Sequence, residues 1–156
     1  MIMQVSLRPS PNTQHDLQAD HSADSTTASL DPKKLTFPLN VYAKVLLLQE
    51  GEAEYLHYGL FQNAQTSLKE AQQYSTALLI SKLPPPPCRI LEAGTGLGKT
   101  FSLLRQKGYD VFAITSDAIQ IDYIHQAQGT EVSVSRHSLE TFSAKPESFD
   151  VILLQE

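Results

Sequence analysis

The chain has 156 residues, of which 41% are hydrophobic, and a formal net charge of −5, which suits one globular domain and more rarely two. This acidic balance, without a basic face, argues against nucleic acid as a main partner, and no apolar run approaches the ~20 residues of a membrane-spanning helix. The single cysteine, Cys88, excludes an internal disulfide framework and a multi-cysteine zinc site, and since the N-terminus has no apolar signal-peptide core we expect a soluble, cytoplasmic protein.

The first 36 residues form a polar segment without an aromatic side chain. Ser, Thr, Asp, Gln and Pro are frequent in it, and such a composition buries too little apolar surface to offset the entropy of ordering. We therefore expect residues 1–36 to be a disordered tail. Its histidines, His15 and His21, are scattered, and they predict no metal site.

Residues 37–87 are expected to form a helical lead-in. Val41, Val45 and Leu48 recur at helical spacing and predict a helix over residues 41–50. The aromatic sequence EYLHYGLF, residues 54–61, is interrupted by a glycine and predicts a loop.

A longer helix is expected over residues 66–83. Its predicted apolar stripe consists of Leu68, Ala71, Ser75, Leu78 and Leu79. The side chains expected on the opposite face are those of Lys69, Gln72, Gln73 and Thr76. The proline run at residues 84–87 ends the helix, because proline lacks the amide proton and its ring clashes in a helix interior.

From residue 88 onward, strand and helix patterns alternate. The expected strands are residues 89–92, 110–115, 131–135 and 149–154, and the expected helices are residues 100–107 and 118–127. This alternation predicts parallel β-α-β units with right-handed crossovers. The fold class is therefore α/β, a Rossmann-like parallel sheet with flanking helices over residues 88–156. Because the chain stops at the end of the fourth strand, we expect the N-terminal portion of a longer fold.

The segment RILEAGTGLGKT, residues 89–100, joins a short apolar strand to the beginning of a helix. Glu92 ends the strand, and Gly94, Gly96 and Gly98 follow at alternate positions. Glycine permits positive φ angles and a close approach of the backbone to a ligand, and the amides of a helix N-terminus face anionic groups. The segment therefore predicts a site for a nucleotide-like cofactor.

Two families fit these residues. Glu92-x-Gly-x-Gly-x-Gly resembles motif I of S-adenosylmethionine-dependent methyltransferases. Ala93-x-x-x-x-Gly98-Lys99-Thr100 resembles a P-loop whose first glycine is replaced by alanine. In a P-loop, Lys99 would reach the phosphates and Thr100 would hold Mg²⁺. A P-loop also needs an acid at the end of a later strand, where this chain offers Gln155-Glu156.

Three further features favour the methyltransferase, and with motif I they cover roughly residues 54–156. DVFAITSDAIQIDYIHQ resembles motif II of the cyclopropane-fatty-acid-synthase-like, small-molecule type, with Thr115 in place of the usual acid and Gln120 in the helix. EYLHYGLF and SLKEAQ resemble an aromatic-glycine loop that covers the cofactor and the helix after it. ESFDVILLQE resembles the fourth-strand motif, whose end lines the methyl-transfer site.

The resemblance implies the N-terminal portion of a class I methyltransferase fold, which would transfer a methyl group from S-adenosylmethionine to a small-molecule acceptor. The alternatives are a P-loop module that binds ATP or GTP and an inactive fragment that binds cofactor. No catalytic residue is identified. The implied cofactor-binding residues are Tyr58, Gly59, Glu92, Ala93, Gly94, Thr95, Gly96, Gly98, Thr115, Ser116, Gln120, Ser138, Leu139 and Gln155.

For one residue and two groups of residues, the sequence allows two interpretations. Asp117 either replaces the acid missing at Thr115 or caps the next helix, and we favour the cap. After the third strand, either His137, Ser138 or the Leu139 amide contacts the adenine, or the loop is simply solvated. The third open case is whether a lid or a small core cluster is formed by Tyr55, Tyr58 and Phe61.

Overall fold

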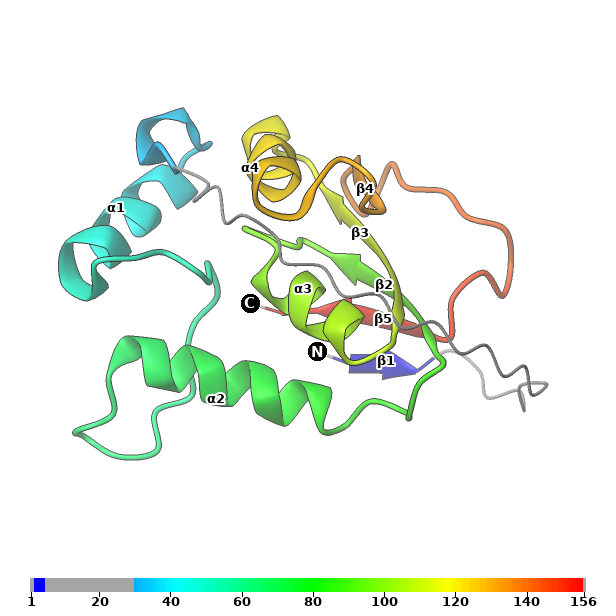
Figure 1. Ribbon diagram of the computed structural model, residues 1–156, viewed down its shortest axis with the longest axis horizontal. Helices are drawn as coiled ribbons and strands as arrows, with labels where there is room; N and C mark the ends of the chain where they lie inside the picture. Colours follow the sequence, from blue (N-terminus) through cyan, green and yellow to red (C-terminus); the bar gives the residue numbers. More distant parts are fainter. Residues whose placement is uncertain (1, 5–29, 156) are drawn as a thin grey trace, which may run out of the picture.

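The computed structural model describes residues 2–4 and 30–155 (Figure 1). The helices are the 3-10 turn η1 (Pro32–Lys34), α1 (Leu39–Glu50), α2 (Leu68–Ile80), α3 (Lys99–Gln106) and α4 (Ala118–Gln128). The strands are β1 (Ile2–Gln4), β2 (Arg89–Ala93), β3 (Asp110–Thr115), β4 (Val134–Arg136) and β5 (Val151–Leu154). None of the helices in this described part combines the length and the apolarity that crossing a membrane requires.

The strands form one sheet in the order β1-β5-β2-β3-β4. The predicted Rossmann-like parallel sheet is confirmed, because β5, β2, β3 and β4 are parallel neighbours, with Ile90 opposite both Val111 and Val151. The predicted third and fourth strands are shorter in the structure and begin at Val134 and Val151. Strand β1 adds an antiparallel edge to β5, which the sequence did not predict.

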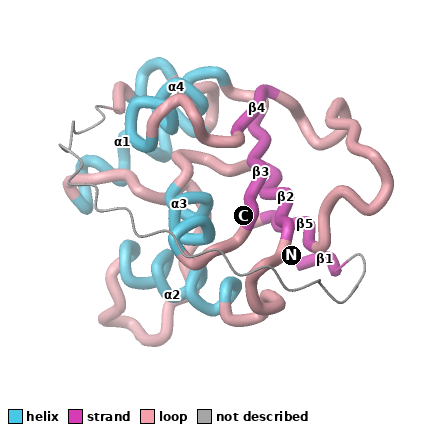
Figure 2. Tube along the Cα trace, turned by 45° about the vertical axis from the view of Figure 1, so that its right-hand side comes forward, coloured by secondary structure: helices cyan, strands magenta, loops and turns pink. Residues whose placement is uncertain are grey.

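The two faces of the sheet are covered differently. Figure 2 shows the α-helices on one side and the long loop of residues 137–150 on the other. On the helix side, the core contains Ile90, Val111, Ala113, Val151 and Leu153 from the strands, with Phe101, Leu104 and Ile124 from α3 and α4. On the loop side, Leu91, Ala93 and Ile114 pack against Phe112, Phe142 and Phe149. Alternate residues of β2 thus face opposite cores, as the pleat of a strand requires.

The helix termini follow from local hydrogen bonds. Asp117 caps α4 by accepting a hydrogen bond from the Ile119 N–H at 2.8 Å, so the predicted cap is confirmed. Ser67 caps α2 in a reciprocal capping box with Glu70, which sets the first residue of this helix at Leu68 rather than at the predicted Thr66.

The buried face of α2 differs from the predicted apolar stripe. Its buried residues are Ala71, Gln72 and Thr76, whereas Leu78 is 38% exposed. The prediction placed Gln72 and Thr76 on the solvent side. They lie inside because polar backbone and side-chain groups of residues 53–57 pack against this helix, and a polar side chain is favoured where it satisfies such groups.

Two parts of the predicted disordered tail have defined structure. Residues 2–4 form β1, and near α1 the Leu35 side chain is buried while Thr36 hydrogen-bonds to Asp117. Residues 5–29, with His15 and His21, lie outside the described residues, so their disorder stays a prediction. The proposed division at residues 36 and 87 also stays a prediction.

Candidate functional site

A cavity of about 510 Å³ lies at the carboxyl ends of β2, β3 and β5. This is the edge at which open α/β sheets bind ligands, and the volume falls within the roughly 300–1,000 Å³ of small-molecule sites. Segments far apart in the sequence line it, namely residues 36–39, 54–57, 92–97, 99–100, 114–117, 120, 137–139 and 154–155. The cavity is therefore formed by the tertiary fold rather than by one loop.

The glycine-rich turn after β2 forms one wall of this cavity. Gly94 and Gly96 have φ angles of 75° and 57°, which side chains with a Cβ rarely adopt. The Gly94 N–H donates to the Ile114 carbonyl at 2.9 Å, which holds the turn against β3. Gly98 has a different role, because a Cβ there would lie 2.7 Å from Ile124 Cγ1. Gly98 thus lets α3 begin close to α4, and it is not among the described residues that line the cavity.

Glu92 lies at the end of β2 and is only 4% exposed. Its carboxyl group accepts a hydrogen bond from the Thr95 hydroxyl at 3.1 Å. Burial raises the pKa of Glu92 to about 8, although the Thr95 hydrogen bond opposes the shift. Among the described residues Glu92 has no ion-pair partner. A cationic group of a ligand placed beside Glu92 would therefore favour its ionised form.

Lys99 and Thr100, the two residues on which a P-loop would depend, both line the cavity. The Lys99 ammonium forms an ion pair with Glu54. The Thr100 hydroxyl donates to Oε1 of Gln155 at 3.1 Å. Both side chains are thus held by protein groups, and the geometry favours the glycine turn over the Lys-Thr pair as the binding element.

The end of β3 carries a second polar wall. The Thr115 hydroxyl donates to Gln120 Oε1 at 2.6 Å and accepts from the Asp117 N–H at 3.2 Å. Oδ1 of Asp117 accepts the capping hydrogen bond from the Ile119 N–H. Its Oδ2 accepts from the backbone N–H and from the hydroxyl of Thr36, at 3.1 and 2.9 Å. Burial alone would raise the pKa of Asp117, but the hydrogen bonds from Thr36 and from Ile119 hold it below its ordinary value.

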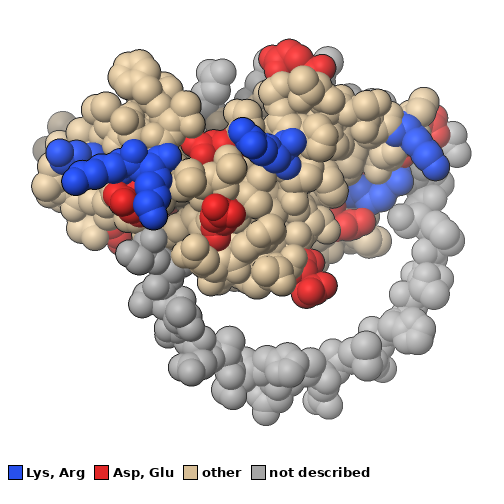
Figure 3. All heavy atoms as spheres, turned by 90° about the horizontal axis from the view of Figure 1, so that it is seen from above, with Lys and Arg blue, Asp and Glu red and all other residues tan. Residues whose placement is uncertain are grey.

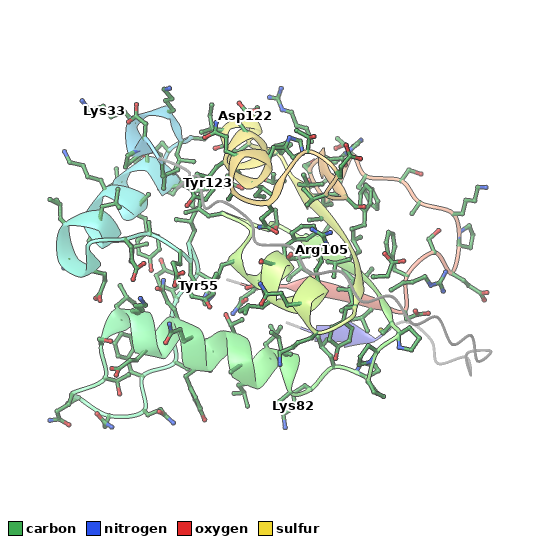
Figure 4. The ribbon with its side chains drawn as sticks, in the orientation of Figure 1. Lys33, Tyr55, Lys82, Arg105, Asp122 and Tyr123 are labelled. Atoms are coloured by element: carbon green, nitrogen blue, oxygen red, sulfur yellow. The ribbon has the colours of Figure 1, made fainter. Side chains whose placement is uncertain are left out.

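Residues 53–57, which we call the strap, cover the cavity from the side of α2 and α1. Tyr55 and His57 are 4% and 8% exposed, and both line the cavity. Figure 4 shows Tyr55 between α1 and α2. Burial, followed by the nearby Glu54, raises the pKa of Tyr55 to about 12. The Gln72 amide donates to the His57 carbonyl at 2.8 Å and so ties the strap to α2.

The loop after the strap lies elsewhere than the sequence resemblance suggested. Tyr58 and Phe61 are 75% and 59% exposed, so the three aromatic residues form neither one lid nor one core cluster, since only Tyr55 is buried. Gly59 packs against α2, where a Cβ would lie 2.5 Å from Ala71 Cβ. Among the described residues, the cavity lining includes neither Tyr58 nor Gly59.

The loop after β4 completes the lining with His137, Ser138 and Leu139. The His137 N–H donates to the Thr115 carbonyl at 3.0 Å, which brings this loop beside the end of β3. Nδ1 of His137 lies 2.9 Å from the Ser135 hydroxyl. The structure places all three residues at the cavity, and which of them contacts a ligand stays a prediction.

Most of the predicted site residues meet at this one cavity. They are Glu92, Ala93, Gly94, Thr95, Gly96, Thr115, Ser116, Gln120, Ser138, Leu139 and Gln155. The lining residues that the sequence did not single out include His57 and residues 36–39, whereas Tyr55 was considered as part of a lid. Residues 36–39 carry no motif. Tyr55 and His57 belong to the aromatic segment of residues 54–61, but only the fold shows which members of that segment are buried.

Charged side chains can serve both as metal ligands and, gathered on one face, as a binding surface. The described residues contain no group of three or more His, Cys, Asp and Glu side chains that could hold a metal ion. On the face shown in Figure 3, basic and acidic side chains are interspersed. That face therefore offers no continuous basic surface of the kind that binds a phosphate backbone.

Comparisons with known proteins identify the fold. No protein-family model and no curated protein matches the chain. A solved structure of coclaurine N-methyltransferase, bound to N-methylheliamine and SAH, matches with a TM-score of 0.56 and 21% identity over 70% of this chain and 35% of that chain. The [4+2]-cyclase SpnF matches with a TM-score of 0.50 and 20% identity over 62% and 38%. This chain thus spans little more than a third of either structure and shares their Rossmann-like fold.

Proposed function

We propose that the chain is the cofactor-binding portion of an S-adenosylmethionine-dependent methyltransferase and that the cavity at the ends of β2, β3 and β5 holds the cofactor. One observation carries the proposal. The glycine turn and the buried carboxyl of Glu92 form a wall of a cavity large enough for a cofactor, while Lys99 and Thr100 are held by Glu54 and Gln155.

The residues that line the cavity suit the parts of this cofactor. The amides at the start of α3 would face the carboxylate of its amino-acid end. Glu92 would meet a positive group, because a buried carboxyl without a cation gains a partner there. At the end of β3, the Thr115 hydroxyl holds Oε1 of Gln120, which leaves the Gln120 NH₂ to donate to the ribose diol. The bound cofactor would supply the methyl group, and the protein residues would orient it.

The acceptor that we propose is a small molecule. Methyl transfer depends mainly on holding donor and acceptor in line, and it needs neither a metal nor a covalent nucleophile from the protein. Coclaurine N-methyltransferase, which has the same fold, was solved with a small organic molecule, N-methylheliamine. SpnF, which also matches, is named as a cyclase, so the fold alone does not fix the reaction.

Calorimetric titration of the purified chain with S-adenosylhomocysteine, and separately with Mg-ATP, tests the cofactor. We expect the first ligand to bind and the second not to bind. Glu92→Ala should weaken binding of S-adenosylhomocysteine by about 1.5–3 kcal/mol, the usual size for a hydrogen bond to a charged group. Lys99→Ala is the matched control within the same turn, and it should weaken the binding much less.

Two results would contradict the proposal. One is binding of Mg-ATP that depends on Lys99 and not on Glu92, which would assign the turn to a P-loop. The other is the absence of binding to both ligands by a folded chain. If S-adenosylhomocysteine binds, equilibrium dialysis against candidate amine, hydroxyl and carbon acceptors would then identify the acceptor class.

A further inference from the structure

Thr76 is a buried polar residue on α2. Its hydroxyl is hydrogen-bonded to two side chains that line the cavity. The residue is 1% exposed. Its Oγ1 lies 3.1 Å from Nε2 of His57 in the strap and 3.1 Å from Nε2 of Gln155, just after β5. Oε1 of Gln155 in turn accepts from the Thr100 hydroxyl at 3.1 Å. Four residues from four separate elements thus form one chain of hydrogen bonds.

The hydrogen bonds that connect these four residues all run in one direction, because each donor can be assigned. Nδ1 of His57 lies 2.7 Å from the Tyr58 carbonyl, and since a carbonyl only accepts, Nδ1 carries the proton of the neutral ring. Nε2 of His57 is then an acceptor and takes the Thr76 hydroxyl proton. The Thr76 oxygen is left to accept from the Gln155 amide nitrogen, so the Gln155 carbonyl faces Thr100.

We propose that Thr76 is a positioning residue for the cofactor cavity, because its hydroxyl transmits the hydrogen-bonding state of His57 to the side-chain amide of Gln155. The inference rests on the proposed function, since His57, Gln155 and Thr100 all line the same cavity. Gln155 directly follows β5, and its side chain lines the cavity. The orientation of its amide therefore decides whether a donor or an acceptor is offered to what binds there.

Protonation of His57 reverses the chain. A charged ring donates from both nitrogens, so Thr76 accepts from His57 and turns its own proton toward Gln155, whose amide turns over to receive it. Burial lowers the pKa of His57 below its ordinary value of 6.5, although the hydrogen bond to the Tyr58 carbonyl opposes this. The orientation seen in the structure is therefore kept at pH 7 and is lost only when the pH falls to the lowered pKa of His57.

Other titratable groups surround the strap and the cavity. Those packed against His57 are Tyr55, whose ring centroid lies 5.0 Å away, and Tyr42 of α1, whose hydroxyl donates to the His57 carbonyl. The other titratable groups that line the cavity are Glu54 of the strap, Glu92, Lys99, Asp117 and His137. The pKa values of Tyr42 and Tyr55 are raised and that of Asp117 is lowered, so these three keep their charge states between pH 5 and 7. Glu92, whose pKa is about 8, ionises within the tested interval, so it is the group that a control has to separate.

The first test measures the affinity for S-adenosylhomocysteine at several pH values between 5 and 8. In the unmodified chain we expect the affinity to fall roughly three- to tenfold as the pH drops below 6.5, the size of one lost hydrogen bond. Thr76→Val should be weaker by a similar factor at pH 7 and should lack this step. Thr76→Ser should restore the step, and Glu92→Gln, which cannot ionise, should retain it. A step that persists in Thr76→Val would overturn the proposal.

The second test does not need a ligand. In ¹⁵N-labelled protein at pH 7, His57 should be neutral with its proton on Nδ1, and the Gln155 side-chain amide should shift with the same midpoint as His57 during a pH titration. If the amide does not respond, the relay does not exist, even where S-adenosylhomocysteine binds. If the amide responds but S-adenosylhomocysteine does not bind, the relay stands and the proposed function fails.

Discussion

The hydroxyl of Thr115 donates a 2.6 Å hydrogen bond to Oε1 of Gln120, and both residues are almost fully buried at the cavity wall. The same hydroxyl accepts from the Asp117 N–H. One oxygen therefore fixes the residue that caps α4 and a side chain in the first turn of that helix. The end of β3 therefore carries a neutral hydroxyl–amide pair.

Replacing Thr115 by Val keeps the shape of the side chain and removes this oxygen. The Gln120 carbonyl and the Asp117 N–H would each lose a partner, and we expect the free energy of unfolding to fall by about 1–3 kcal/mol. Urea denaturation measures the change. Thr115→Ser, which keeps the hydroxyl, should cost about the 0.8 kcal/mol of one buried methyl group. Equal stability of the Val variant and the unmodified chain would show that the pair contributes nothing.

Glu92 should make the free energy of unfolding of the ligand-free protein depend on pH. Its pKa is about 8 in the fold and has its ordinary value of 4.5 in the unfolded chain, so between these values the folded state holds a proton that the unfolded state has lost. The free energy of unfolding should therefore be highest below pH 4.5 and should fall as the pH rises toward 8, by up to about 1.4 kcal/mol per unit.

Urea denaturation of the chain and of Glu92→Gln at pH 5, 6, 7, 8 and 9 checks this dependence. The Gln variant cannot ionise, so its stability should lack the decline attributed to Glu92. The pKa of Asp117 is lowered from 3.8, so this carboxyl contributes no slope within the interval. A decline of the same steepness in both proteins would place its origin elsewhere.

The sequence predicted the strands around the cavity better than it predicted what covers the cavity. The glycine turn, Thr115 and Gln120 were predictable because each lies at the end of a strand or at the start of a helix whose pattern is local. The inward face of α2 was not, because Gln72 and Thr76 are buried by hydrogen bonds to the strap, which lies up to 19 positions away. Binary patterning assigns such polar residues to solvent.

Strand β1 and residues 30–36 were unpredictable for a related reason. A strand of three residues has too little pattern of its own and is defined by its pairing with β5. Thr36 is placed by Asp117, 81 positions away. Composition describes what a segment can bury by itself, and it does not anticipate a partner that the rest of the fold supplies.

The contact between Asp117 and Thr36 should hold residues 30–36 beside the cavity. Asp117→Ala removes both the cap of α4 and the acceptor of the Thr36 donors, and we expect a loss of about 1–2 kcal/mol. Hydrogen exchange should increase at the Thr36 amide and at its neighbours. Ser67→Ala, which removes the cap of α2 alone, is the matched control and should leave exchange at Thr36 unchanged. Unchanged protection of Thr36 in Asp117→Ala would rule out the tether.

Gly59 should be required for the position of the strap. A Cβ at this residue would lie 2.5 Å from Ala71 Cβ and 2.7 Å from the Gln72 N. The backbone atoms of α2 are held by the helix hydrogen bonds and cannot shift individually. Gly59→Ala should therefore push the loop and the adjoining strap away from α2. We expect a loss of about 1–3 kcal/mol of stability. The affinity for S-adenosylhomocysteine should fall as well, because Tyr55 and His57 line the cavity.

Gly51→Ala separates this steric effect from the general cost of adding a methyl group to a glycine. Gly51 has a φ of 77°, and a Cβ there would meet no atom within 4 Å. Its substitution should cost about 1–2 kcal/mol of backbone strain and leave the strap, and hence the affinity, unchanged. If Gly59→Ala bound S-adenosylhomocysteine as tightly as Gly51→Ala, the strap would not be part of the cofactor site, and the cavity would have to bind through its strand-end walls alone.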